Sequence, residues 1–153
     1  MNMKPIRNSA KAMIIQDHRI LLTKNRDEQG EYYLFPGGGQ EKYEQLRETV
    51  QRECMEELGC EVDVKDIVYV REYIGKHHEF AAWDADFHQV EFYFECTMTT
   101  NVDVTQATQL DNDQIGVEWV EISRLHEVRV YPKTLVKNLQ DEALKPCYIG
   151  DAN

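Results

Sequence analysis

Residues 36–60 read "PGGGQEKYEQLRETVQRECMEELGC", in which three glycines follow a proline and an acidic run follows the glycines. The run predicts a helix from about Glu41 to Leu58, with Gly59 at the usual C-cap position. One row of that helix is apolar at i,i+4 spacing and consists of Leu46, Val50, Cys54 and Leu58. We expect this row to pack on a sheet.

Three glutamates crowd one side of the predicted helix. On a wheel of about 100° per residue, Glu53 and Glu57 lie one turn apart beside the apolar row, and Glu56 lies about 60° beyond Glu53. A solvated acidic face is the ordinary interpretation in a chain of net charge −11. A cation site is the alternative, and it is favoured here because the acids flank the buried row. They also lie in the C-terminal half of the helix, where the dipole disfavours negative charge.

The residues around these acids suit a cation. Carboxylate oxygens are hard ligands of the kind that Mg²⁺ prefers, and Mg²⁺ bridges to phosphates. Gly37–Gly39 would let the backbone pass close to the ion and offer a bare carbonyl. Arg52 precedes Glu56 by four residues and can pair with it across one turn.

The spacing from Gly38 onward resembles a known family motif. Gly38 is followed by five residues, Glu44, seven residues, and then "RECMEELGC" at 52–60. This resembles the Nudix box, G-x5-E-x7-R-E-U-x-E-E-x-G-U with U a bulky aliphatic residue, and all fixed positions match. The flanking stretches "LFPGGGQE" and "VEWVEISRL" are also similar to the family. Both U positions are cysteines, and Tyr43 stands where many members have glycine.

The resemblance implies a metal-dependent hydrolase. Nudix enzymes cleave a nucleoside diphosphate linked to a moiety X, using Mg²⁺ or Mn²⁺ and water. Carried over, Glu53, Glu56 and Glu57 are the main metal ligands, with the Gly38 carbonyl as another. Glu53 or Glu57 orients or deprotonates the water, and the sequence leaves that choice open.

Two further positions of the box take supporting roles by the same resemblance. Arg52 holds the carboxylates through hydrogen bonds. Glu44 pairs with Arg52 or contacts a second metal through water. Some branches of the family supply another acid from a loop before a late strand. Here the loop 99–117 offers Asp111 and Asp113; Asp113 is favoured as a metal ligand, against a plain polar turn.

Substrate contacts are predicted outside the box. Arg26, like Lys24, could reach a phosphate or end a solvated strand. Phe80 and Trp83 lie in a long loop, Ile74–Phe87, and could stack on a base or anchor the loop. A transition-metal site at His77, His78 and His88 is disfavoured, because their spacing is not that of metal ligands.

The remaining chain predicts a single domain over residues 1–153 of the α/β (α+β) class. We expect a Nudix-type α/β/α sandwich, in which a mixed, curved sheet lies between helices. The predicted strands are Ser9–Gln16, Arg19–Thr23, Tyr32–Phe35, Cys60–Glu72 with a break near Lys65, His88–Met98 and Gly116–Val120. Polar loops are predicted at 25–31 and 99–114, and a second helix at Pro132–Leu144.

Composition limits the kinds of partner and the location that we expect for this protein. The net charge of −11 argues against binding to a nucleic-acid polymer, and no apolar run is long enough for a membrane span. The four cysteines show no disulfide or zinc spacing, which favours packing roles and a cytoplasmic location. The expected partner is a small nucleotide derivative, and a homodimer is expected from the relatives.

Three functions remain open on the sequence alone. ADP-ribose or another nucleoside-diphosphate sugar is the first expected substrate. An ordinary or oxidised (d)NTP is the second. A Nudix domain that binds nucleotide without catalysis is the alternative of another class, disfavoured because the box acids are all present.

Overall fold

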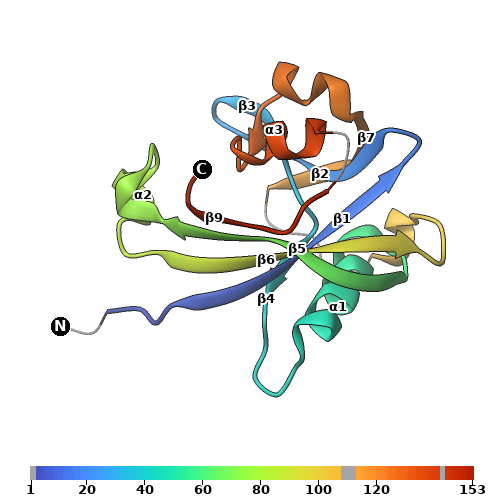
Figure 1. Ribbon diagram of the computed structural model, residues 1–153, viewed down its shortest axis with the longest axis horizontal. Coiled ribbons are helices and arrows are strands. Elements are labelled where there is room, and N and C mark those ends of the chain that lie inside the picture. Colours follow the sequence, from blue (N-terminus) through green and yellow to red (C-terminus); the bar gives the residue numbers. More distant parts are fainter. Residues whose placement is uncertain (1–2, 108–112, 142–143) are drawn as a thin grey trace.

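The computed structural model describes residues 3–107, 113–141 and 144–153 and shows one large sheet with helices on both faces (Figure 1). The strands are β1 (Arg7–Gln16), β2 (Arg19–Asp27), β3 (Gly30–Leu34), β4 (Gly37–Gly39), β5 (Val62–Ile74), β6 (His88–Met98), β7 (Gln114–Glu121), β8 (Val130–Tyr131) and β9 (Cys147–Asp151). The α-helices are α1 (Leu46–Leu58), α2 (Ala81–Asp84) and α3 (Leu135–Gln140). Short 3₁₀ turns are η1 (Gly75–His77), η2 (Val104–Gln106) and η3 (Ile122–Glu127).

Strand β1 is the centre of the sheet. The main path runs β8-β3-β2-β1-β6-β5-β9, while β4 pairs with β1 and β7 pairs with β2. Strand β1 is parallel to β6 and antiparallel to β2 and β4. This mixed pairing confirms the predicted fold class and places the glycine strand β4 beside β1.

The alternation of side chains along β1 builds two cores. Ala10, Ala12 and Ile14 point to one face, where they meet the apolar row of α1. Met13 points to the other face, where it joins a core that includes residues of η3 and α3. Helix α1 therefore lies against one face of the sheet, and η3 and α3 cover the other (Figure 1).

The acidic helix begins later than predicted. It starts at Leu46, not near Glu41, because Tyr43 has a positive φ of 73° that interrupts helical geometry. Gln45 and Glu48 form a capping box at the true start, and Gly59 ends the helix in the left-handed conformation with φ 64°. The predicted C-terminal end is confirmed.

Several other boundaries differ from prediction. The segment 25–31 is not a loop, because β2 and β3 pair as a hairpin from Thr23↔Leu34 to Asp27↔Gly30. The long segment after β5 contains η1 and α2, and the predicted second helix reduces to α3, with residues 142–143 outside the described part. Strand β5 continues through the predicted break, with register shifts after Val64. Strand β9 was not predicted.

The cysteines divide into two kinds. Cys54, Cys60 and Cys96 are buried and unpaired, which confirms their packing role. Cys147 is also a free thiol but is exposed at the start of β9, so the packing assignment is wrong for that residue.

Candidate active site

Strand β4 has to be bare backbone because its neighbours leave no room for side chains. A Cβ at Gly37, where φ is 142°, would lie 2.1 Å from the Ala10 carbonyl oxygen. A Cβ at Gly38 would lie 2.5 Å from an Oε atom of Glu53. The triple glycine therefore lets the acidic side of α1 lie directly against the main chain.

Arg52 is the hub of the acidic cluster. Its Nε and Nη2 atoms donate to both Glu44 carboxylate oxygens at 2.8 and 3.0 Å, and Nη2 also donates to the Gly39 carbonyl at 3.0 Å. Its Nη1 atom donates to Glu53 at 3.0 Å and to Glu56 at 3.3 Å. One guanidinium thus ties three of the box carboxylates to the glycine strand.

The pKa values of Glu44 and Glu53 are shifted in opposite directions. The Arg52 hydrogen bonds lower the pKa of Glu44 to about 2 from an ordinary 4.5. Burial raises the pKa of Glu53, and the charge of Glu56 raises it further, while Arg52 acts against both. The cluster therefore holds more negative charge than one arginine neutralises.

Glu57 is the most deeply placed acid of the box. Its side chain is only 2% exposed, and one carboxylate oxygen accepts from the Gly37 N–H at 3.2 Å. The Gln114 side chain donates to the Glu57 main-chain carbonyl at 3.2 Å. Gln114 was missed at the sequence level, where its only signal was its place next to Asp113.

The register between β4 and β1 decides which carbonyl faces the acids. In an antiparallel ladder, successive residues direct their N–H and C=O groups alternately toward and away from the partner. The Pro36 carbonyl accepts from β1 at 2.8 Å, and the Gly37 N–H is directed away to Glu57. Gly38, paired with Ala10, is directed back toward β1. The register thus disfavours the predicted Gly38 carbonyl as a ligand and favours that of Gly37.

The donor set has the chemistry of a magnesium site without being a finished cage. Within the described residues, no three His, Cys, Asp or Glu side chains converge with metal-ligand geometry. Arg52 holds Glu53 and Glu56, and Glu57 is turned to a backbone N–H. Mg²⁺ keeps several of its waters and needs only one or two carboxylates. The carboxylates would fit such an ion if it replaced some of the hydrogen bonds that Arg52 now donates to Glu53 and Glu56.

The other predicted metal ligand lies at the rim of this region. Asp113 accepts from the Tyr32 hydroxyl at 2.9 Å, and its carbonyl accepts from the Arg26 N–H at 3.1 Å. Within the described residues, its connection to the box runs through its neighbour Gln114. The competing candidate, Asp111, lies outside the described residues.

The predicted substrate contacts are not gathered at the box. The Arg26 side chain pairs with Glu31 at 3.1 Å, and Phe80 packs edge-on against Tyr131 with centroids 5.7 Å apart. Trp83 is 81% exposed. Phe80 thus anchors its loop, while neither interpretation of Trp83 is supported by a contact.

The histidines contact carboxylates of the scaffold. His77 and His78 both contact the Asp151 carboxylate, at 2.8 and 2.6 Å, and His88 contacts Glu72 at 3.1 Å. Each contact joins strands or loops of the scaffold.

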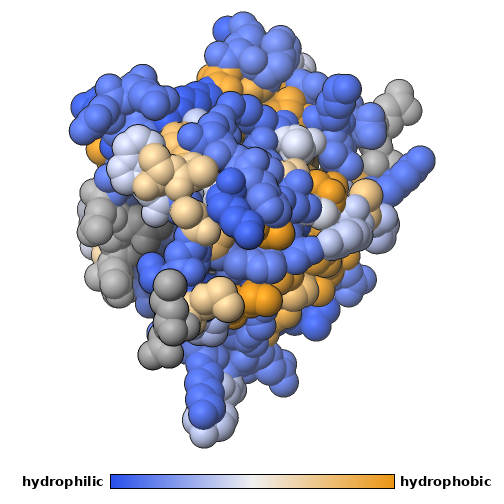
Figure 2. Space-filling model, turned by 90° about the vertical axis from the view of Figure 1, so that its left-hand side faces the viewer, coloured by the Kyte–Doolittle hydropathy of each residue, from blue (hydrophilic) through white to orange (hydrophobic). Residues whose placement is uncertain are grey.

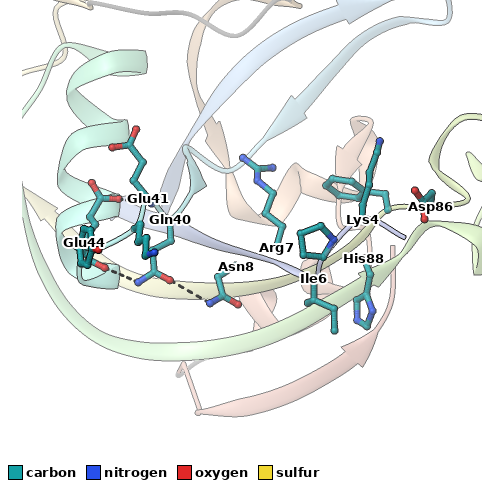
Figure 3. Close-up of a pocket in the computed structure, with 13 residues that line it drawn as sticks. Lys4, Ile6, Arg7, Asn8, Gln40, Glu41, Glu44, Asp86 and His88 are labelled. Atoms are coloured by element: carbon teal, nitrogen blue, oxygen red, sulfur yellow. Dashed lines mark hydrogen bonds between the residues drawn. The ribbon is translucent and has the colours of Figure 1, made fainter. Parts of the chain in front are cut away.

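A groove of about 1040 Å³ lies next to the box (Figure 3). Its walls are the segment before and at the start of β1, the loop between β4 and α1, and the start of β6, that is residues 4–8, 40–44 and 86–88. On one wall the Asn8 amide donates to Gln40, which donates in turn to the Glu44 carbonyl. Its volume suits a ligand of nucleotide size.

The surrounding surface is mainly polar. Figure 2 shows hydrophilic side chains over most of one side of the molecule, with smaller apolar areas between them. In the described part of the chain, no helix is long and apolar enough to cross a membrane.

A mixed sheet, a glycine strand and a glutamate-rich helix organised by one arginine define the class of hydrolases that act on phosphoanhydrides. The model of the NUDIX domain matches residues 5–139. The chain belongs to the Nudix family, and the expected class of enzyme, a Nudix pyrophosphohydrolase, is confirmed at the level of the family.

Solved structures share this fold at low sequence identity. The MutT NUDIX hydrolase from Burkholderia pseudomallei has a TM-score of 0.68 at 21% identity, over 92% of this chain and 100% of its own. An ADP-ribose pyrophosphatase from Streptococcus suis has a TM-score of 0.65 at 16% identity, over 94% and 99%. The E. coli ORF135 protein has a TM-score of 0.65 at 19% identity, over 88% and 86%. A search of curated protein sequences finds no match.

Proposed function

We propose that this protein hydrolyses the pyrophosphate bond of a nucleoside diphosphate linked to a moiety X, releasing a nucleoside monophosphate and phosphorylated X. The observation that carries the proposal is the packing of the acidic side of α1 against a side-chain-free strand, with Glu53 and Glu56 bound to Arg52 and Glu57 bound to the Gly37 N–H. Such an excess of carboxylate is stabilised by a divalent cation.

In the proposed site each residue has one task. Glu53, Glu56 and Glu57 hold Mg²⁺ or Mn²⁺, together with the Gly37 carbonyl. Arg52 orients the carboxylates and yields part of its hydrogen bonding when the cation binds, while Glu44 keeps Arg52 in place through two hydrogen bonds.

The chemistry follows from charge. The cation, when bound, offsets the charge on the pyrophosphate and lowers the pKa of water. Glu53 and Glu57 are the candidate bases for the attacking water. Asp113 stays a candidate for an additional ligand from the loop before β7.

For the substrate we propose ADP-ribose or another nucleoside-diphosphate sugar. The groove of about 1040 Å³ beside the box would take the nucleoside or the sugar. One structural relative is named an ADP-ribose pyrophosphatase, whereas others are named MutT proteins and one a UDP-X diphosphatase. A (d)NTP or an oxidised nucleotide is the second candidate. We also propose a single-domain, cytoplasmic enzyme that forms a homodimer.

A substrate panel tests the proposal. Purified protein is incubated with ADP-ribose, other nucleoside-diphosphate sugars and (d)NTPs in Mg²⁺ or Mn²⁺, and nucleoside monophosphate is measured. Glu57→Gln should lose about 100- to 1,000-fold in kcat/KM. Glu61→Gln, a charge-matched change at an exposed residue just past α1, should be unaffected.

Two results would contradict the proposal. Equal activity of wild type and Glu57→Gln would remove the acidic cluster from the mechanism. Metal-dependent binding of a nucleotide without turnover of any panel member would favour the nucleotide-sensing alternative.

A further inference from the structure

The face of β4 opposite Glu53 carries two cations from β1. A Cβ at Gly39 would lie 2.4 Å from Nη2 of Arg7, and a Cβ at Gly37 would lie 2.9 Å from Cδ of Lys11. Successive residues of a strand face opposite sides. Gly37 and Gly39 therefore face the cations, while Gly38 faces the glutamate.

In the described part of the chain no direct ion pair occupies the charge of Arg7 or Lys11, although the charge of Lys11 helps from a distance to lower the pKa of Glu91. Among the residues that the structure describes, Arg7 donates to the Gln89 amide oxygen at 2.8 Å and to no other side chain. Glu91, which lies on the same face as Lys11, is already bonded to Arg71 at 2.6 Å. By contrast, the scaffold pairs six other arginines with carboxylates, namely Arg26, Arg47, Arg52, Arg71, Arg124 and Arg129.

Arg7 is nevertheless held in a defined place. The Gln89 side chain that binds it is buried and donates to Glu91 at 2.6 Å, which fixes the amide oxygen toward Arg7. Arg7 itself is exposed and leaves β1 on the side opposite Asn8 (Figure 3). Between the two cations, Ser9 is 1% exposed, and its hydroxyl has no hydrogen-bond partner among the described residues. The arrangement is a preformed, positively charged cradle along bare backbone.

The glycine strand thus separates charges of opposite sign. One side carries the glutamates of α1, and the other carries Arg7 and Lys11. We propose that Arg7 and Lys11 form an anion site that binds the diphosphate group of the substrate from the side of β4 opposite the glutamates. This inference rests on the proposed function, because it assigns a second set of contacts to the same diphosphate.

Guanidinium groups bind phosphate oxygens through two parallel hydrogen bonds, which gives both affinity and orientation. Arg7 has its Nε and Nη2 groups beside Gly39 and without protein acceptors in the described residues. The site is expected to contribute to the ground state and the transition state alike, and therefore to KM more than to kcat.

The first test uses steady-state kinetics on the substrate found in the panel. Arg7→Gln should raise KM by about 10- to 100-fold with a smaller change in kcat. Arg7→Lys, which keeps the charge but loses the fork, should fall between wild type and Arg7→Gln. Arg19→Gln is the matched control, because Arg19 is exposed and also lacks an ion pair in the described residues.

The second test needs no turnover and uses inorganic pyrophosphate in the presence of a chelator. Calorimetry should give salt-dependent binding to wild type that weakens about 10-fold in Arg7→Gln and in Lys11→Gln. On the wild-type protein, pyrophosphate should shift the NMR signals of the Arg7 Nε–H and the Gly37–Gly39 amides. That readout remains even if a variant fails to fold.

The two proposals fail in different ways. Unchanged KM and unchanged pyrophosphate binding in Arg7→Gln, with Glu57→Gln inactive, would overturn the anion site and leave the hydrolase intact. Pyrophosphate binding that depends on Arg7 in a protein that hydrolyses nothing would keep the anion site and overturn the proposed reaction.

Discussion

Arg52 and Arg71 both bind glutamates, and they do so in opposite ways. Arg52 contacts several carboxylates at once, has a side chain 25% exposed and binds Glu44, which lines the groove. Arg71 is 5% exposed and pairs with one buried carboxylate, Glu91, at 2.6 Å. Its remaining nitrogens donate to Ala152 and Asn153, both at 2.7 Å.

The difference lies in how completely each charge is satisfied. Glu91 also accepts from Gln89 at 2.6 Å and from the Tyr93 hydroxyl at 2.5 Å. Burial opposes its ionisation, yet Lys11 and Arg71 hold its pKa below the ordinary value. In this closed network the charge of Glu91 is already neutralised and hydrogen-bonded, so no further cation is needed. The Arg52 cluster has more acid than base and opens to solvent, so a cation can enter it.

The largest expected effect comes from breaking the closed pair. Arg71→Met leaves Glu91 buried without its partner, which should lower the free energy of unfolding by about 3–5 kcal/mol. The midpoint of thermal unfolding should fall by roughly 10 °C, measured by calorimetry. The double variant Arg71→Met/Glu91→Leu should recover much of this loss. If Arg71→Met alone were as stable as wild type, the Arg71–Glu91 pair would not be needed to hold β5 against β6 and β9.

The open cluster should respond in function instead of stability. Arg52→Gln should weaken Mn²⁺ binding by about 10- to 100-fold, because the carboxylates lose the group that orients them. Its unfolding free energy should fall by only about 1–2 kcal/mol, since the acids can still reach water. Millimolar Mg²⁺ should reduce that deficit by binding the folded state. Titration calorimetry measures the Mn²⁺ affinity, and chemical denaturation with and without Mg²⁺ measures the unfolding free energy. If Mg²⁺ did not reduce the loss of unfolding free energy in Arg52→Gln, the idea that the cation takes over part of the role of Arg52 would be contradicted.

The contrast also explains what the sequence could reveal. The Arg52 cluster is local, because its helical acids and glycine strand lie within residues 37–57 and their spacing predicts their meeting. The Arg71 network joins three segments far apart in the chain, namely β5, β6 and the residues after β9, and no local pattern indicates that Glu91 is buried. For the same reason β9, the hairpin at 25–31 and the place of Arg7 were missed, since each depends on a partner strand. The helix start was misplaced because the left-handed Tyr43 is a turn feature that apolar spacing does not register.

A smaller effect is expected from the glycine strand itself. Gly38→Ala places a methyl group where a Glu53 oxygen now lies 2.5 Å from the Cβ position. The carboxylate must move, so we expect about a 10-fold loss of kcat/KM and a stability loss of roughly 1–2 kcal/mol. Gly116→Ala is the matched control, because nothing lies within 4 Å of its Cβ position. Gly116→Ala should change neither kcat/KM nor the free energy of unfolding measurably. An equal loss in both variants would mean that the effect of Gly38→Ala does not come from the displacement of Glu53.

The smallest effect is the pH dependence of the open cluster. The folded-state pKa of Glu44 is about 2 against an ordinary 4.5, because Arg52 stabilises the charged form. A carboxyl group with a lowered folded pKa stabilises the fold fully above its unfolded pKa, and that stabilisation disappears as the pH falls through the folded value. The stability difference between wild type and Glu44→Gln should therefore be constant above about pH 5 and shrink between 4.5 and 2. In Arg52→Gln the Glu44 pKa, followed by NMR, should move back toward 4.5, because the group that lowered it is gone. A Glu44 pKa that stays near 2 without Arg52 would assign the shift to the Thr49 hydroxyl, which donates at 2.7 Å, and would weaken the view of Arg52 as the organiser of the site.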